Sequence, residues 1–346
     1  MKNFHYCFLQ NSRSMKNRTI FFEKRPIGKP TKKCFLIKET PVQTLQNKEV
    51  LIKTLYVSVD PYLRGRMSDR KSYTTGFNLG DPMKSGVVGE VVESKNPDFA
   101  RGEFVAGMLN WSEYQISSGE GLNKVDGNAA PLSAYLGLLG MPGLTAYLGL
   151  MEIGQPKQGE TLVVSGAAGA VGSIVGQIGK ILGCRVVGIA GSDEKTSLLK
   201  SDFGYDEGIN YKTTKNMQKA IAQACPKGVD VYFDNVGGEI SDGVMMNISK
   251  FARIAICGAI SQYNETQLTT GPRLQSVLLV NSALMKGFIV RDYAVKFQGA
   301  IQQLAQWYGE GKLKSKETIV EGFENIPEAF IGLFEGTNTG KMVVKI

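Results

Sequence analysis

The chain has 346 residues, of which 42% are hydrophobic and 21% charged, and its formal net charge is +8. This length suits about two globular domains. The basic residues are spread along the chain without a basic stripe, which argues against a nucleic-acid partner. No apolar run reaches the ~18 residues that cross a bilayer, which argues against a membrane partner. The positive charge indicates an ordinary solvated surface or, alternatively, attraction of a polyanionic cofactor or an acidic substrate.

The first residues are expected to lie outside the fold. Residues 1–16 contain only a short apolar patch broken by His5, and Met15 precedes the first strand-like pattern. This indicates a disordered tail or a misassigned start rather than a signal peptide. Because His5 is the single histidine, no two-histidine metal site is expected. Five separated cysteines without a C-x-x-C pair favour reduced thiols and a cytoplasmic location.

Residues 17–143 are predicted to form a β-rich domain. Short runs such as NKEVLIKTLYVSVDP and GVVGEVVES are rich in strand-forming residues and are separated by turns. This pattern is typical of an antiparallel or barrel-like sheet. Residues 131–151 are predicted to be helical, since Tyr135, Leu138 and Leu139 share a helical face, and we expect them to bridge two domains.

Residues 144–312 are predicted to form an α/β domain. Strand-like runs alternate with helical ones from Thr161 onward, and such alternation implies a doubly wound parallel sheet with helices on both faces. The apolar residues 276–290 are expected either to extend a sheet across a two-fold axis or to form an ordinary buried strand. Residues 313–346 end in the strand-like KMVVKI and are expected to return to the first domain.

A glycine-rich turn follows the strand-like run TLVVS. Gly166, Gly169 and Gly172 recur at every third residue, and the apolar run SIVGQIGKIL comes next. The N-terminus of a helix at such a turn offers backbone N–H groups to a pyrophosphate, and glycine permits its close approach. The strand and helix on either side favour dinucleotide binding over an ordinary turn, although the spacing differs from the usual G-x-G-x-x-G.

The end of the next strand, RVVGIA, predicts which dinucleotide binds. Gly191 and Ser192 follow it, where an NAD-binding protein usually places an acidic residue on the ribose 2′-hydroxyl. Lys195 can reach back from the helix start, and a cation there favours the 2′-phosphate of NADPH. Alternatively, Lys195 is a solvated helix residue. The sequence therefore favours NADPH/NADP as the cofactor.

With these motifs the chain resembles the zinc-independent medium-chain dehydrogenases/reductases, in particular the prostaglandin/leukotriene reductases, the alkenal double-bond reductases and curcumin reductase. The resemblance spans residues 17–346 and rests on DPYLRGRM (60–67), AAGAVGS (167–173), GSDEK (191–195), NYK (210–212), DNVGG (234–238), CGAISQYN (257–264) and NTGKMVVK (338–345). It implies an α/β protein with a GroES-like β-rich catalytic domain, which holds the substrate, a Rossmann domain, which holds NADPH, and assembly as a homodimer.

The resemblance also implies which residues hold the cofactor. The pyrophosphate would lie on the glycine turn, two residues would hold the 2′-phosphate end, and residues at four later places in the chain would contact the remaining nucleotide and the nicotinamide. These residues are Gly169, Ala170, Val171, Gly172 and Ser173 at the turn; Lys195 and Tyr211 at the 2′-phosphate; and Asn235, Cys257, Gly258, Ala259, Ile260, Ser261, Phe288, Ile289, Val290 and Asn338 along the rest.

Two tyrosines are the catalytic candidates. The resemblance implies that Tyr263 lies near the substrate carbonyl and that Tyr62 faces the same cleft. A phenol with a pKa near ~10 stays protonated at neutral pH and can donate a hydrogen bond to a developing enolate oxygen. Alternatively, Tyr263 is an aromatic packed on its neighbours and Tyr62 a turn anchor. Arg64 and Arg66 are expected at the surface; alternatively, they hold the loop or attract an anionic substrate.

The predicted reaction needs no metal. Residues 84–93, KSGVVGEVVE, lack the metal-binding histidine of the zinc alcohol dehydrogenases, so no metal site is expected. The predicted function is NADPH-dependent hydride addition to the C=C bond of an α,β-unsaturated ketone or aldehyde, with a small enone or enal as substrate. Two alternatives stay open: an NADPH quinone oxidoreductase of the same fold, and a non-catalytic NADPH-binding regulatory protein.

Overall fold

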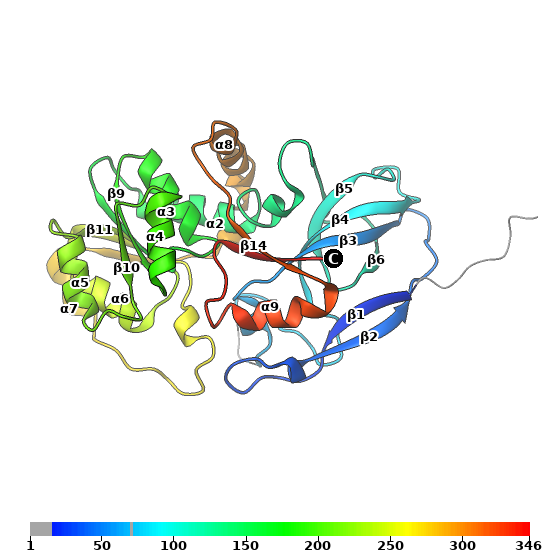
Figure 1. Cartoon of the computed structure of the whole chain (residues 1–346), viewed down its shortest axis with the longest axis horizontal. Coiled ribbons are helices and arrows are strands. Elements are labelled where there is room, and N and C mark those ends of the chain that lie inside the picture. The colour runs from blue at the N-terminus through cyan, green and yellow to red at the C-terminus, as the bar shows by residue number, and fades with distance from the viewer. Residues whose placement is uncertain (1–15, 70–71) are drawn as a thin grey trace, which may run out of the picture.

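The computed structural model describes residues 16–69 and 72–346, which form two lobes side by side (Figure 1). The expected tail falls on residues 1–15, outside this range, and on Lys16. Lys16 begins the first strand, so the fold starts one residue before the predicted domain. In the part of the chain that is described, no helix has the length and apolarity to cross a membrane.

Strands alternate with helices mainly in the second half of the chain. The strands are β1 (Lys16–Phe22), β2 (Phe35–Pro41), β3 (Val50–Ser58), β4 (Lys84–Ser94), β5 (Phe104–Asn110), β6 (Tyr114–Ser117), β7 (Asn123–Val125), β8 (Thr161–Ser165), β9 (Arg185–Ala190), β10 (Glu207–Asn210), β11 (Val229–Asp234), β12 (Ile248–Ile256), β13 (Leu284–Gly287), β14 (Glu317–Glu321) and β15 (Lys341–Lys345). The α-helices are α1 (Leu63–Arg66), α2 (Met141–Gly149), α3 (Gly172–Ile181), α4 (Asp193–Ser201), α5 (Met217–Ala224), α6 (Gly238–Met245), α7 (Gln275–Asn281), α8 (Phe297–Gly309) and α9 (Ile326–Gly332).

The first lobe, here called the β lobe, is built on a mixed sheet. Among the described residues its strand order is β14-β15-β3-β4-β5-β7, with β6 paired to β3 and with the hairpin β1-β2 alongside. Strand β15 comes from the end of the chain and pairs antiparallel with β3. The core contains the fully buried Trp111, whose indole Nε1 donates to Ser85 Oγ at 2.7 Å. A buried indole N–H needs such an acceptor, so this pair fixes β4 against the end of β5.

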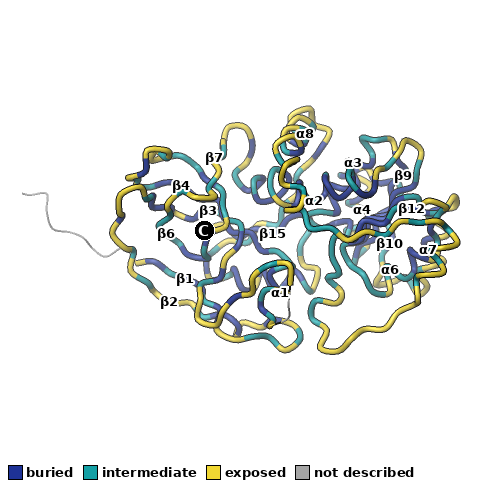
Figure 2. Tube along the Cα trace, turned by 180° about the vertical axis from the view of Figure 1, so that it is seen from behind, coloured by how far each residue is buried: buried dark blue, intermediate teal, exposed yellow. Residues whose placement is uncertain are grey.

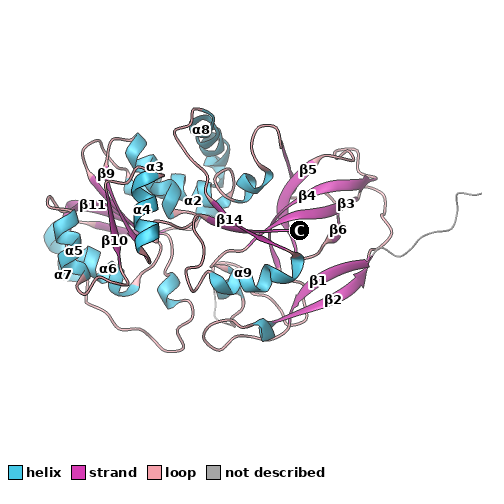
Figure 3. Ribbon diagram, viewed as in Figure 1, coloured by secondary structure: helices cyan, strands magenta, loops and turns pink. Residues whose placement is uncertain are grey.

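The second lobe, here called the Rossmann lobe, is built on a parallel sheet with the order β10-β9-β8-β11-β12-β13. Successive side chains of a strand point to opposite faces. Leu162 and Val164 of β8 accordingly enter one apolar cluster with α2, α3 and α8, whereas Val163 enters another with α5, α6 and α7. Figure 3 shows helices on both sides of this sheet. The predicted doubly wound α/β fold is confirmed.

The bridge between the lobes is less regular than predicted. Residues 131–151 form a 3₁₀ turn (Leu132–Leu136) and then α2, which runs into a π-helical turn (Leu150–Gly154). The break falls at residues 137–140, where the backbone turns back on itself. A Cβ on Gly140 would lie 2.2 Å from the carbonyl oxygen of Tyr135, so only glycine permits this turn.

Residues 276–290 are not one strand. Their first part belongs to α7, and only β13 is a strand, at the edge of the parallel sheet. Leu284 of β13 is 53% exposed, so an ordinary buried strand is the wrong interpretation. The preceding loop, residues 265–273, is exposed along its whole length (Figure 2).

Candidate active site

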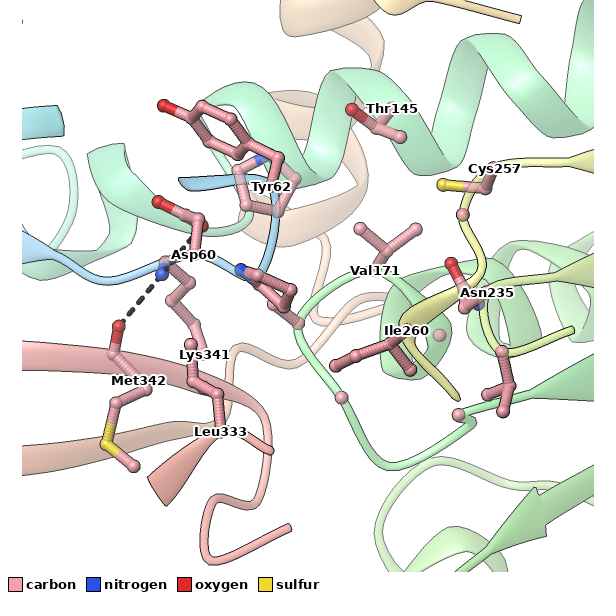
Figure 4. Close-up of a pocket in the computed structure, with 18 of the residues that line it drawn as sticks. Asp60, Tyr62, Thr145, Val171, Asn235, Cys257, Ile260, Leu333, Lys341 and Met342 are labelled. Atoms are coloured by element: carbon pink, nitrogen blue, oxygen red, sulfur yellow. Dashed lines mark hydrogen bonds and ion pairs between the residues drawn. The ribbon is translucent and has the colours of Figure 1, made fainter. Parts of the chain in front are cut away.

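A cavity of about 2360 Å³ lies between the two lobes. Tyr62 and Tyr73 line it from the β lobe, and the glycine turn and the loops after β9, β11 and β12 line it from the Rossmann lobe. This is the carboxyl edge of the parallel sheet, where open α/β proteins bind their ligands. In Figure 4, Asp60 and Tyr62 lie on one side of the cavity, and Asn235 and Cys257 lie on the other.

The glycine turn packs tightly between β8 and α3. Gly166 has φ +59°, and a Cβ on Gly172 would lie 2.4 Å from the carbonyl oxygen of Gly166. The N–H of Gly340 donates to Ala168 O at 2.7 Å, so the segment before β15 rests on this turn. Gly169 lines the cavity where α3 begins, which gives a pyrophosphate a cradle at the N-terminus of a ten-residue helix.

The loop after β11 is organised by a buried carboxylate that the sequence analysis did not single out. Asp234 is 2% exposed, and its oxygens accept five hydrogen bonds. The donors are Ser165 Oγ (2.8 Å), Tyr232 Oη (2.8 Å), Ser241 Oγ (2.8 Å) and the N–H groups of Val236 (3.0 Å) and Gly237 (2.9 Å). Asn235 in turn donates from Nδ2 to Ser165 O at 2.8 Å. These bonds fix the cavity-facing loop onto β8.

Lys195 and Lys212 line the cavity beyond the end of β9, beside Glu194 in the first turn of α4. Ser192 caps α4 by accepting from the N–H of Lys195, and Lys195 Nζ donates to Gly336 O at 2.7 Å. Partial burial and then the nearby charge of Lys212 lower the pKa of Lys195. A phosphate would relieve this repulsion between the two cations. Tyr211 lies against Gly191, where a Cβ would be 3.0 Å from the phenol ring.

We expect Lys195→Ala to weaken NADPH selectively. A charge-assisted hydrogen bond is worth about 1.5–3 kcal/mol, which corresponds to a rise of roughly 10- to 100-fold in the KM for NADPH. The KM for NADH, which has no 2′-phosphate, should stay nearly constant. Steady-state kinetics with both cofactors measures the effect. Lys200→Ala on the same helix, whose ammonium pairs with Glu207 at 3.7 Å, is the control. Equal losses for both cofactors would contradict the assignment.

Tyr263 follows a 3₁₀ turn (Ile260–Gln262) and lines the cavity. Its hydroxyl oxygen accepts from the N–H of Ala259 at 3.3 Å. The phenolic hydrogen is not consumed by this bond and can be donated to a ligand. Burial raises the pKa of Tyr263, which keeps that hydrogen in place at neutral pH. Burial also raises the pKa of Cys257 to about 12, so this cavity-lining thiol stays neutral.

Tyr62 stands on a loop that a buried lysine holds in place. Lys341 is 3% exposed, and its Nζ donates to Val59 O (2.7 Å), Asp60 Oδ1 (3.0 Å) and Met342 O (2.8 Å). Burial, and then the Asp60 carboxylate, raise the pKa of Tyr62. Tyr62 therefore also keeps its proton. The resemblance over residues 338–345 includes Lys341 without a role; the available signal was a lysine directly before the three apolar residues 342–344.

The surface position favoured for the two arginines of residues 60–67 is wrong for Arg64, which fits the alternative that it holds the loop. Arg64 is buried, at 7% exposure. Its guanidinium donates to Gly28 O at 2.9 Å and to Asn264 Oδ1 at 3.1 Å. Arg66 is half-buried, lies 3.9 Å over the ring of Phe77 and donates to Thr75 O. Local sequence could not show the two acceptors of Arg64, because they are distant along the chain.

Most of the predicted site residues meet at the one cavity. Phe288 reaches it from the edge of the sheet and packs on Phe233 with ring centroids 6.2 Å apart. Ser173 and Ala259 do not line it: Ser173 is 4% exposed inside the start of α3, and the N–H of Ala259 is bonded to Tyr263. Those that line it are Tyr62, Gly169, Ala170, Val171, Gly172, Lys195, Tyr211, Asn235, Cys257, Gly258, Ile260, Ser261, Tyr263, Phe288, Ile289, Val290 and Asn338.

The arrangement fits a phosphorylated dinucleotide. The glycine turn at the start of α3 suits a pyrophosphate, and the lysine pair beyond β9 suits a further phosphate. In the described part of the chain, no group of three or more His, Cys, Asp or Glu side chains could hold a metal ion. The described cysteines, Cys34, Cys184, Cys225 and Cys257, are free thiols, and Cys7 lies outside that part.

Fold and site together define a two-domain oxidoreductase of the medium-chain dehydrogenase/reductase class. Residues 18–125 match the family model described as the N-terminal domain of oxidoreductase, and residues 170–307 match the model described as zinc-binding dehydrogenase. The chain belongs to the group of NADP-dependent reductases within this class, as the resemblance predicted. Prostaglandin reductases and a 2-alkenal reductase are among its relatives.

Three comparisons carry this assignment. A candidate NADP-dependent oxidoreductase of Bacillus subtilis (strain 168) is 57% identical, covering 93% of this chain and 96% of the relative. The NADPH-dependent curcumin reductase of Escherichia coli (strain K12) is 43% identical, covering 96% and 97%. The crystal structure of CurA from Vibrio vulnificus in complex with NADPH superposes with a TM-score of 0.90 at 44% identity, covering 95% of this chain and 98% of that one.

Proposed function

We propose that this protein is an NADPH-dependent reductase that adds hydride to the C=C bond of α,β-unsaturated ketones or aldehydes without zinc. The observation that carries the proposal is the pair of protonated phenols, Tyr263 and Tyr62, on a cavity that also contains the dinucleotide cradle. The curcumin reductase relative supports the same chemistry, because curcumin contains conjugated enones.

The side chains of the site suit this reaction step by step. Bound NADPH supplies the hydride. The N–H of Ala259 donates to the hydroxyl oxygen of Tyr263 and helps to fix its position. The hydroxyl can then donate a hydrogen bond to the carbonyl oxygen of the substrate as negative charge develops there. Tyr62, fixed by the Lys341 and Asp60 pair, can orient the substrate from the opposite lobe. Phe288 and Val290 offer apolar surface that excludes water beside the reacting carbon.

Oxidation of NADPH and NADH by the purified protein tests the proposal. A simple enone, a 2-alkenal, curcumin and a quinone are compared at equal concentration, and the product is examined for the saturated carbonyl compound. We expect NADPH-dependent reduction of the enone and the enal. A clear preference for the quinone would support the quinone oxidoreductase alternative. Tight NADPH binding without turnover of any of the four compounds would support a non-catalytic regulatory protein.

We further propose that the two lobes bind different ligands. Residues 17–143 and 313–346 would hold the substrate and the catalytic groups, and residues 144–312 would hold NADPH. The pairing of β15 with β3 and the position of the glycine turn support this division. The free thiols support a reducing, cytoplasmic location.

A homodimer is the proposed assembly. Strand β13 leaves one edge of the parallel sheet open, and apolar side chains are exposed on β13 (Leu284, 53%) and on the preceding helix α7 (Leu279, 80%, and Val280, 77%). An open edge of this kind is suited to pairing with a second copy of the same strand. Sedimentation should give twice the chain mass of 37.7 kDa, and Leu284→Lys should return the protein to monomer. A wild-type protein that sediments as a monomer would contradict the proposal.

A further inference from the structure

We propose that Arg64 is a positioning residue, which holds the loop that carries Tyr263 through its bond to Asn264. This inference rests on the function proposed above. Arg64 lies in α1, two residues after Tyr62, and Asn264 directly follows Tyr263. The Nε of Arg64 donates to Asn264 Oδ1 at 3.1 Å, across 200 residues of sequence. One guanidinium therefore ties together the segments that carry both tyrosines.

The direction of the guanidinium is fixed by a third segment. Gly28, in the loop between β1 and β2, accepts from Arg64 Nε at 3.2 Å and from one terminal nitrogen at 2.9 Å. Gly28 has φ +68°, and a Cβ there would lie 3.7 Å from the carbonyl oxygen of Asn264, so the two loops are in contact. A planar guanidinium held at two nitrogens presents Nε to Asn264 in one orientation. A lysine could not do so.

On its N-terminal side, the segment that carries Tyr263 is held by the Rossmann lobe. Ser261 donates from its N–H (3.1 Å) and its hydroxyl (2.6 Å) to Val236 O, and Ile260 donates to Asn235 O at 3.3 Å. Tyr263 thus lies between one anchor on the Rossmann lobe and one on the β lobe. Beyond Asn264 the chain enters the exposed residues 265–273. The Arg64–Asn264 bond therefore lies between Tyr263 and this exposed loop along the chain.

Loss of the bond is expected to act on turnover more than on cofactor binding. An error of about 1 Å in the position of a catalytic group costs on the order of 10²-fold in rate. The contacts of the glycine turn and of Lys195 do not involve Arg64 or Asn264. We therefore expect kcat to fall by roughly 10-fold or more, while the Kd for NADPH changes by less than about twofold.

Four variants test this with the enone as substrate. Asn264→Ala removes the acceptor, whereas Asn264→Asp keeps it and should restore most of the turnover. Arg64→Lys keeps the charge without the fork, and Arg64→Lys combined with Asn264→Ala should be no slower than the slower single variant. Arg185→Met is the control, because Arg185 makes the same two-nitrogen contact to one carbonyl, that of Ala224, at the far end of β9. It should leave kcat unchanged.

Hydrogen exchange provides a readout that does not depend on activity. The amides of residues 259–264 should exchange faster in Asn264→Ala than in the wild type, and those of α3 should not. If the wild type reduces no enone, the proposed function fails, and the exchange rates still decide the role of Arg64. If the wild type is active and Asn264→Ala keeps both its kcat and its exchange rates, the positioning role is overturned alone. Asn264 is only half-buried, so its variants serve even if Arg64→Lys does not fold.

Discussion

Replacement of Tyr263 by phenylalanine should lower kcat for enone reduction by about 100-fold. The change removes one hydroxyl and keeps the ring. Loss of a single hydrogen-bond donor from a site of developing negative charge typically costs on the order of 10²-fold or more. Because burial raises the pKa of Tyr263, its proton is present throughout the neutral range. Deprotonation of Tyr263 should therefore not lower the activity of the wild type between pH 6 and about 8.

A measurement of NADPH binding distinguishes a loss of catalysis in Tyr263→Phe from a general loss of structure. The Kd for NADPH, measured by fluorescence titration, should be unchanged in Tyr263→Phe, since its hydroxyl bonds to Ala259 and not to the glycine turn. Tyr114→Phe, on β6 outside the cavity, is the matched control and should keep full activity. A Tyr263→Phe enzyme with the wild-type kcat would show that the donor is another group, with Tyr62 the next to test.

Replacement of Gly172 by alanine should abolish high-affinity NADPH binding. The new Cβ would lie 2.4 Å from Gly166 O and 2.8 Å from Ala167 Cα. Both are backbone atoms of the turn itself, so the turn must move. Overpacking of this kind costs about 1–3 kcal/mol, and a cradle that no longer presents its N–H groups should raise the Kd for NADPH by roughly 100-fold. Isothermal titration and thermal unfolding measure the two effects.

Gly299→Ala is the matched control for this variant. Gly299 lies within α8, where an added Cβ would meet nothing within 4 Å. Alanine in a helix is favoured over glycine by about 0.5–1 kcal/mol, so Gly299→Ala should be at least as stable as the wild type and should bind NADPH normally. If Gly172→Ala retained the wild-type affinity, the pyrophosphate could not lie on this turn.

The cofactor cradle could be read from the sequence because its cause is local. Gly166, Gly169 and Gly172 lie within seven residues: Gly166 has a positive φ, and a Cβ on Gly169 or Gly172 would meet the carbonyl oxygen of Gly166. The small residues after β9 and Lys195 at the start of α4 are equally local. Patterns of this kind predict both the fold and the end of the cavity where a phosphate fits.

The contacts between lobes could not be read in the same way. Arg64 was expected at the surface because arginine usually is. Its acceptor Asn264 lies 200 residues away along the chain and becomes a neighbour only in the folded protein. Lys341 meets Asp60 across 281 residues. Ser173 and Ala259 do not line the cavity, although their neighbours in the sequence do. Sequence spacing does not decide which side of a turn faces the cavity.

Strand β15 follows the whole Rossmann lobe in the sequence, yet it lies inside the β lobe, between β14 and β3. Lys345 pairs with Tyr56, near the start of the chain. On the ribosome the Rossmann lobe can complete its sheet while the β lobe still lacks an inner strand, and domains that fold during synthesis generally do so as their residues emerge. The β lobe therefore gains this inner strand only after every strand of the Rossmann lobe has been synthesised, so the cavity between the lobes is completed late.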